Sequence, residues 1–176
     1  MTSPPAPDKY ANEDPDEPWS VLPHPDGVLR IATVNVNGIR AAFRKGMARW
    51  VEAAQPDILA LQEVRAATDD VERLFAGIDG NWHIAHDASR VKGRAGVAIA
   101  SRLPFTNIRT ALGTNELDST GRWLEADFAV DGCKLTVVSA YVPTGGVGTP
   151  KQVHKYQMLD AMLLRLPQLA EQHQLA

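Results

Sequence analysis

The sequence predicts an α/β fold, in the broad sense that includes α+β, with helices packed on a mixed sheet. Three observations support this class. Short apolar runs alternate with segments of helical periodicity in the first part of the chain. Several strand patterns then follow without a helix between them. The chain has 176 residues, of which 44% are hydrophobic and 22% charged, as in one globular domain.

The first 28 residues differ in composition from the rest of the chain. They hold six acidic residues against the single base Lys9, and seven of the twelve prolines. A segment this polar and proline-rich cannot bury a core. We therefore expect a disordered acidic leader at residues 1–28 and a globular part at residues 29–176. Competition between the leader and nucleic acid for a basic site stays open beside the simpler interpretation of a solvated tail.

The first elements of the globular part follow from apolar periodicity. Residues 29–34 (LRIATV) form a buried strand pattern, and residues 57–62 (DILALQ) form a second one. Residues 39–54 carry apolar side chains at helical spacing, and Pro56 ends that helix. Thr68 is typical of an N-cap, because acidic residues occupy the turn that follows it. A short helix is therefore expected after Thr68.

The second half of the sequence predicts strands and one long helix. Residues 81–86 and 96–100 are expected strands. Residues 123–130 and 134–142 form a hairpin, because the Asp131-Gly132 dipeptide favours the primed turn that matches strand twist. A final helix begins at about Lys151, and Pro167 is expected to kink or end it.

The composition excludes several classes of protein. The only cysteine, Cys133, cannot form an internal disulfide, which suits a reducing compartment. No window reaches the roughly 20 apolar residues of a membrane helix, and no secretory signal pattern is present. We expect a cytoplasmic protein with no membrane partner.

Polar side chains follow two of the predicted strands directly. Asn35, Asn37 and Gly38 come after the first strand, and Glu63 comes after the second. Hard cations such as Mg²⁺ take oxygen ligands from one or two carboxylates, with water and phosphate completing the shell. There are alternatives to a metal site. The Asn and Gly residues after the first strand can simply form a turn, because they tolerate its backbone conformations, and Glu63 can be a solvated surface residue.

Five motifs occur in order at suitable separations. They are NVNGIR at 35–40, PDILALQE at 56–63, GVAIAS at 96–101, GRW at 121–123 and VVSAYVP at 137–143. With them the chain resembles the N-terminal half of exonuclease III and the abasic-site endonucleases of the endonuclease/exonuclease/phosphatase superfamily. The resemblance implies half of a four-layer α/β sandwich, a mixed sheet with helices packed on one face, with the C-terminal half absent.

The resemblance also implies roles for individual residues. Glu63 matches the direct metal ligand, and Asn35 matches the residue that supports the metal or the scissile phosphate. Tyr141 matches the active-site tyrosine; without the resemblance it is an ordinary aromatic residue closing a strand. Candidate contacts to DNA phosphates are Asn37, which also shapes the turn, and the basic residues Arg40, Lys92, Arg94 and Arg122.

The implied activity is hydrolysis of DNA phosphodiesters dependent on Mg²⁺ or Mn²⁺, as 3′–5′ exonuclease and abasic-site endonuclease of base-excision repair. The implied partner is double-stranded DNA with abasic sites or 3′ ends. The water-activating aspartate, an asparagine and a histidine of the family have no counterpart, so we expect an inactive, truncated half. We also expect self-association through an uncovered sheet face.

Three details depart from the family pattern and two other functions stay open. Arg65 replaces a lysine, Arg94-Ala95 replaces an aromatic residue or histidine, and Thr144 replaces an asparagine. These changes bear on substrate preference. The alternative functions are a non-catalytic DNA- or partner-binding module and a hydrolase of small phosphoesters from the same superfamily.

Overall fold

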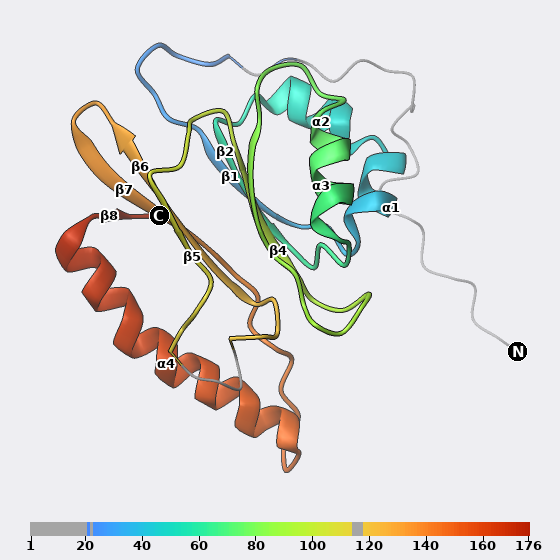
Figure 1. Ribbon diagram of the computed structural model, residues 1–176, viewed down its shortest axis with the longest axis vertical. Coiled ribbons are helices and arrows are strands. Elements are labelled where there is room, and N and C mark those ends of the chain that lie inside the picture. Colours follow the sequence, from blue (N-terminus) through green and yellow to red (C-terminus); the bar gives the residue numbers. More distant parts are fainter. Residues whose placement is uncertain (1–20, 22, 114–117) are drawn as a thin grey trace, which may run out of the picture.

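Figure 1 shows the computed structural model of the chain, which describes residue 21 and residues 23–113 and 118–176. In this part of the chain two four-stranded sheets pack on each other. Short helices cover the outer face of one sheet, and one long helix covers the outer face of the other. Most of the leader expected at residues 1–28 lies outside the described residues.

The first sheet is mixed, as predicted. Its strands lie in the order β1 (Ile31–Asn35), β2 (Ile58–Gln62), β4 (Val97–Ser101) and β3 (His83–Asp87). Strands β1 and β2 are parallel, and Asn35 lies opposite Gln62. Strand β4 runs antiparallel to both of its neighbours. The carboxyl ends of β1 and β2 therefore lie side by side at one edge of the sheet.

The second sheet has the order β5 (Asn107–Arg109), β6 (Trp123–Val130), β7 (Cys133–Ala140) and β8 (Gln174–Leu175). The predicted hairpin is confirmed, because β6 and β7 pair antiparallel and both turn residues have positive φ, 49° at Asp131 and 79° at Gly132. Strands β5 and β8 were not expected. Strand β8 pairs parallel with β7 directly after the last helix.

The two sheets share one apolar core. Ile58, Val97 and Ile99 of the first sheet pack against alternate residues of β6 and β7, among them Leu124 and Phe128. The α/β class and the mixed sheets with helices on one face of each are thus confirmed. The expected uncovered sheet face is wrong, because β6 and β7 point every second side chain inward and cover it. This removes the basis for self-association through that face.

Three short helices cover the outer face of the first sheet: α1 (Ile39–Arg44), α2 (Met47–Ala54) and α3 (Thr68–Phe75). The single helix expected at 39–54 is therefore divided. Gly46 adopts a left-handed conformation with φ of 96°, which ends one helix and begins the next. The N-cap of α3 is Ala67 rather than Thr68. The Thr68 hydroxyl is instead 3.0 Å from His86 Nδ1.

Helix α4 (Pro150–Gln172) crosses the outer face of the second sheet (Figure 1). Its buried residues Met158, Ala161 and Leu169 pack with Trp123. Pro167 was expected to kink or end this helix; the second alternative is wrong, since the helix continues to Gln172. Leu169, beyond the proline, is buried in the same cluster as Trp123. Within the described residues, no helix has both the length and the apolar character needed to cross a bilayer.

A buried ionic network joins α4 to the second sheet. Glu125 of β6 is fully buried, and Arg165 of α4 donates to both of its carboxylate oxygens at 2.7 and 2.8 Å. Arg109 of β5 pairs with Glu125 and also with Asp127, the latter at 2.6 and 2.7 Å. The indole N–H of Trp123 donates to Glu125 at 2.9 Å. The network compensates the buried charges and fixes α4 on the sheet.

Candidate active site

Polar side chains from both sheets meet where β1, β2 and β7 end. Asn35 is the last residue of β1, and Glu63 follows the last residue of β2. Tyr141 follows β7 in the other sheet. Below them the Gln62 amide donates to the Ser139 hydroxyl at 3.2 Å, which links the two sheets. The sandwich therefore brings together three residues that are far apart in the sequence.

The Glu63 carboxylate is the centre of this site. The Asn35 amide donates to Glu63 Oε1 at 2.7 Å. The Arg65 guanidinium forms an ion pair with Glu63 Oε2, and the Tyr141 hydroxyl lies close enough to the same carboxylate to lower its pKa. The Glu63 side chain keeps 13% of its surface exposed. The carboxylate is thus held by Asn35 and Arg65 and still reaches the surface.

These contacts keep Glu63 ionised. The hydrogen bond from Asn35 is the largest influence on its pKa, and together with Tyr141 and Arg65 it outweighs burial and lowers the pKa of Glu63. Burial, followed by the hydrogen bond to Glu63, raises the pKa of Tyr141. The site therefore presents a charged carboxylate beside a protonated phenol.

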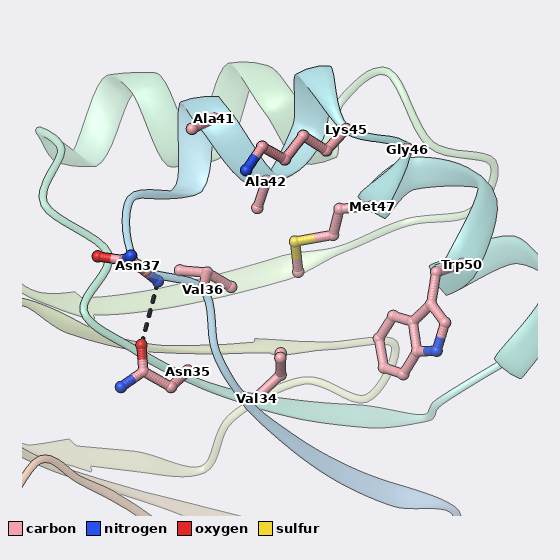
Figure 2. Close-up of a pocket in the computed structure, with 10 residues that line it drawn as sticks. All are labelled: Val34, Asn35, Val36, Asn37, Ala41, Ala42, Lys45, Gly46, Met47 and Trp50. Atoms are coloured by element: carbon pink, nitrogen blue, oxygen red, sulfur yellow. Dashed lines mark hydrogen bonds between the residues drawn. The ribbon is translucent and has the colours of Figure 1, made fainter. Parts of the chain in front are cut away.

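The loops around the site have unusual backbone geometry. Four of the six described non-glycine residues with positive φ lie in them: Asn37, Glu63, Arg65 and Ala95. The Gly38 N–H donates to the Glu63 carbonyl at 2.7 Å. The Asn37 N–H donates to Asn35 Oδ1 at 3.1 Å, drawn as the dashed line in Figure 2. Such left-handed residues cost energy and persist where the surrounding structure holds them.

The donor set fits a hard divalent cation. Glu63 supplies one ionised carboxylate with an exposed surface, and Mg²⁺ commonly takes one or two protein carboxylates together with water and phosphate oxygens. The Asn35 amide oxygen accepts from Asn37 and its amide nitrogen donates to Glu63. In this arrangement Asn35 orients the Glu63 carboxylate.

The five candidate phosphate contacts lie at different distances from this centre. Arg122 covers the Tyr141 ring at 4.8 Å and donates to the Tyr141 carbonyl at 3.2 Å. Asn37 lies in the loop beside Asn35. Arg40 is on α1, where it pairs with Asp70 at 3.3 Å. Lys92 and Arg94 lie exposed in the loop between β3 and β4.

A groove runs from Tyr141 to the start of α4 and has a volume of about 620 Å³. We call it the basic groove; it is lined by Arg94, Arg122, Lys151 and His154, together with Ser89, Val91, Ala95, Thr120, Tyr141, Pro143 and Thr144. The positions where the sequence departs from the family pattern, Arg94-Ala95 and Thr144, therefore lie in one place. None of the described residues lining it is acidic.

A second pocket, of about 380 Å³, lies on the other side of Asn35 between β1 and the helices α1 and α2. Figure 2 shows Asn35 and Asn37 at one end of it and Met47 and Trp50 at the other. Most of its lining is apolar, so the polar groups at the edge of β1 are concentrated at the end that adjoins Glu63.

Sequence reasoning missed some residues of the site. Arg65 was noted only as a departure from a lysine, although its place two residues after Glu63 was a usable signal. Gln62 and Ser139 give no local signal, because they meet across the two sheets. Lys151 and His154 were assigned only to a helix, and the packing of its first turns brings them to the groove.

The fold and this site together describe an α/β sandwich with a carboxylate, an amide and a tyrosine gathered at one edge. A sequence profile of the endonuclease/exonuclease/phosphatase family matches residues 32–174. The chain belongs to this family.

Known relatives agree with this assignment. The chain is 32% identical over 137 residues to the DNA repair nuclease APEX1 of Danio rerio, covering 77% of this chain and 43% of that protein. It is 29% identical over 117 residues to exodeoxyribonuclease III of Haemophilus influenzae, covering 66% and 42%. The solved structure of an AP endonuclease from Archaeoglobus fulgidus superposes with a TM-score of 0.68 at 31% identity, covering 80% and 52%. The chain thus spans about half the length of these relatives or less.

Proposed function

We propose that this chain forms the metal-binding side of the active site of a DNA phosphodiester hydrolase that depends on Mg²⁺ or Mn²⁺ and acts at abasic sites and 3′ ends. One observation carries the proposal: at the edge where two parallel strands end, Asn35 of one sheet donates to the Glu63 carboxylate, and Tyr141 of the other sheet lies close enough to lower the pKa of that carboxylate. The names of the relatives, a DNA repair nuclease, an exodeoxyribonuclease and an AP endonuclease, support DNA as the substrate.

Each side chain has a definite part in this proposal. Glu63 holds the ion, which when bound supplies Lewis-acid stabilisation of charge on the phosphoryl oxygens. Asn35 keeps the carboxylate ionised and oriented. Tyr141 turns its hydroxyl from Glu63 to a phosphoryl oxygen, and its raised pKa keeps it a proton donor at neutral pH. Arg122, stacked on Tyr141, adds positive charge beside the same phosphate.

Water activation is a separate requirement. In-line hydrolysis needs a general base for the attacking water. The described side chains that interact with Glu63 are an amide, a phenol and a guanidinium, and these do not serve as a base at neutral pH. We therefore propose that the 176-residue chain binds Mg²⁺ and abasic-site DNA and hydrolyses it very slowly.

An end-labelled duplex with one abasic-site analogue tests this function. Binding by the full chain should be enhanced by Mg²⁺, with little incision, and Glu63→Gln should remove the enhancement. Asn35→Ala should weaken Mg²⁺ binding by about 10- to 100-fold, the usual effect of removing a group that orients a metal ligand. The exposed Glu52→Gln on α2 is the matched control and should behave as the unchanged chain.

The outcomes separate the alternative functions. DNA binding that is unchanged by Mg²⁺ and unchanged in Glu63→Gln would overturn the proposal in favour of a non-catalytic binding module. Hydrolysis of a nitrophenyl phosphoester without affinity for the duplex would overturn it in favour of a small-phosphoester hydrolase.

A further inference from the structure

We propose that His86 of β3 and Thr68 at the start of α3 are positioning residues for the candidate metal site. Together they hold residues 63–68, which we call the Glu63 loop, in the conformation that presents the Glu63 carboxylate to a divalent ion. This role rests on the proposed function of Glu63 and goes beyond it, because both residues act on the carboxylate through the backbone of the loop.

The Glu63 loop is hydrogen-bonded to the turn that precedes β4. The Val64 N–H donates to the Gly96 carbonyl at 3.0 Å. The Arg65 N–H donates to the Ala95 carbonyl at 2.9 Å. Glu63, Arg65 and Ala95 all have positive φ, between 43° and 53°, and such residues keep this conformation only where their surroundings hold them. The direction of the Glu63 side chain therefore depends on what supports the loop and the turn.

The His86 ring supports both of them. Its Nδ1 is 3.0 Å from the hydroxyl of Thr68, the last residue of the Glu63 loop. Its Nε2 lies behind Gly96, because a Cβ atom at that position would be 3.5 Å from Nε2 and 3.4 Å from the Arg65 nitrogen. Gly96 thus lies between the ring and the loop backbone. His86 therefore supports the turn by packing and the end of the loop by a hydrogen bond.

The Thr68 hydroxyl makes this contact in place of a helix cap. Thr68 is the first residue of α3, and no side-chain hydrogen bond caps that helix. A threonine at the start of a helix commonly offers its oxygen to a free N–H of the first turn. Here the hydroxyl instead connects the Glu63 loop to β3, so the residue serves the loop rather than the helix.

Fold stability alone does not account for a histidine at position 86. Its Nε2 is buried and has no hydrogen-bond partner among the described residues. A buried polar atom without a partner costs free energy, which an apolar side chain of similar size would avoid. Burial also lowers the pKa of His86, so the ring adds no charge at neutral pH. What histidine supplies and an apolar residue lacks is the hydrogen bond between Nδ1 and Thr68.

Replacement of His86 by leucine separates positioning from stability. His86→Leu fills much of the same space, removes the unpaired nitrogen and loses the bond to Thr68. The fold should therefore be at least as stable, whereas Mn²⁺ affinity should fall about 10-fold, the lower end of the effect of removing a group that supports a metal ligand. Urea unfolding measures stability, and the EPR signal of free Mn²⁺ measures affinity. His83→Leu, at an exposed histidine of the same strand, is the matched control and should keep the affinity.

Two further variants test the hydrogen bond itself. Thr68→Val keeps the branched shape and removes the hydroxyl, so it should weaken Mn²⁺ binding about as much as His86→Leu does. His86→Asn keeps an amide group at the position of Nδ1 and should restore most of the affinity. An unchanged affinity in Thr68→Val, or a loss of stability that accompanies the loss of affinity in His86→Leu, would overturn the inference.

Failure of the positioning role and failure of the proposed function give different results. If the unchanged chain binds Mn²⁺ in a manner that Glu63→Gln abolishes, while Thr68→Val and His86→Leu bind it equally well, the positioning role is wrong and the function stands. If the unchanged chain does not bind Mn²⁺, the proposed function is wrong and the positioning role falls with it.

Discussion

At Glu63, three donors act against burial, and the hydrogen bond from Asn35 has the largest effect on the carboxyl pKa. Asn35→Ala should therefore raise the pKa of Glu63, because burial then opposes ionisation with less compensation. An NMR titration of the Glu63 carboxyl in the metal-free chain measures this directly. Asn81→Ala, an exposed asparagine before β3 at the opposite end of the sheet, serves as the matched control. An unchanged Glu63 titration in Asn35→Ala would show that the amide does not set its charge.

The pKa of Asp87, at the end of β3, is shifted in the opposite direction to that of Glu63. Burial raises the pKa of Asp87 to about 6 from an ordinary value of 3.8. Because the unfolded chain loses this proton first, stability falls as pH rises from 3.8 to 6 and the penalty is complete above 6. For this half-buried group the penalty is on the order of 1 kcal/mol after allowing for solvent screening.

Asp87→Asn removes the proton linkage and keeps an acceptor for the neighbouring backbone N–H groups. The variant should be about 1 kcal/mol more stable than the unchanged chain above pH 6, with the gain vanishing below pH 3.8. Urea unfolding at a pH on each side of this interval tests it. A gain of equal size at both pH values would contradict the assigned pKa.

Single residues of the site differ in how far the sequence alone predicts them. Asn35 and Glu63 follow apolar strand patterns directly, so their place at a sheet edge was predictable. The role of Tyr141 came only from the family resemblance, and the structure brings it to Glu63. The contribution of Lys151 to the groove depends on how α4 docks against another sheet, which no local pattern encodes.

At the scale of elements, the ionic network between β6 and α4 should make a large contribution to stability. Glu125 is fully buried between Arg109 and Arg165. Glu125→Gln leaves these two guanidinium groups with less compensation and should cost about 3 kcal/mol, as is typical when one member of a buried ion pair is removed. Urea unfolding measures the loss. Glu171→Gln, exposed on α4, should change stability by less than about 0.5 kcal/mol.

The same network should make the folded protein less stable at acidic pH. Its arginine partners lower the pKa values of Glu125 and Asp127 against the effect of burial. The resulting stability is present above the ordinary values of 4.5 and 3.8 and is lost as the pH falls through the folded-state values. Glu125→Gln should therefore lower the free energy of unfolding more at neutral than at acidic pH. An equal loss at both pH values, or a loss of less than about 1 kcal/mol at neutral pH, would show that the ionised Glu125 carboxylate does not stabilise the fold.

Elements with a strong local signal were predictable and the others were not. Strands β2 and β4 are continuous apolar runs, and the β6–β7 hairpin has its Asp-Gly turn. Strand β5 is short and largely exposed, so its pairing with β6 leaves no apolar pattern. The break at Gly46 was missed because apolar residues at helical spacing continue on both sides of it.

At the scale of the whole molecule, the two sheets form one sandwich, which the sequence did not predict because the resemblance suggested that one sheet was missing. Phe128 of β6 lies in the core that also contains Ile58 and Ile99 of the other sheet. Phe128→Ala should cost about 3–5 kcal/mol and reduce hydrogen-exchange protection in both sheets. Leu164→Ala, 72% exposed on α4, is the control. A loss of protection confined to β6 and β7 would contradict a shared core.

We propose that Glu63, supported by Asn35 and Tyr141, holds a divalent ion at the edge where the two sheets meet. Titration of the isotope-labelled chain with Mn²⁺, followed by NMR line broadening, tests this without relying on catalysis. Broadening should begin at Asn35, Glu63 and Tyr141, should be reversed by added Mg²⁺ and should disappear in Glu63→Gln. Broadening centred elsewhere, or unaffected by Glu63→Gln, would contradict it.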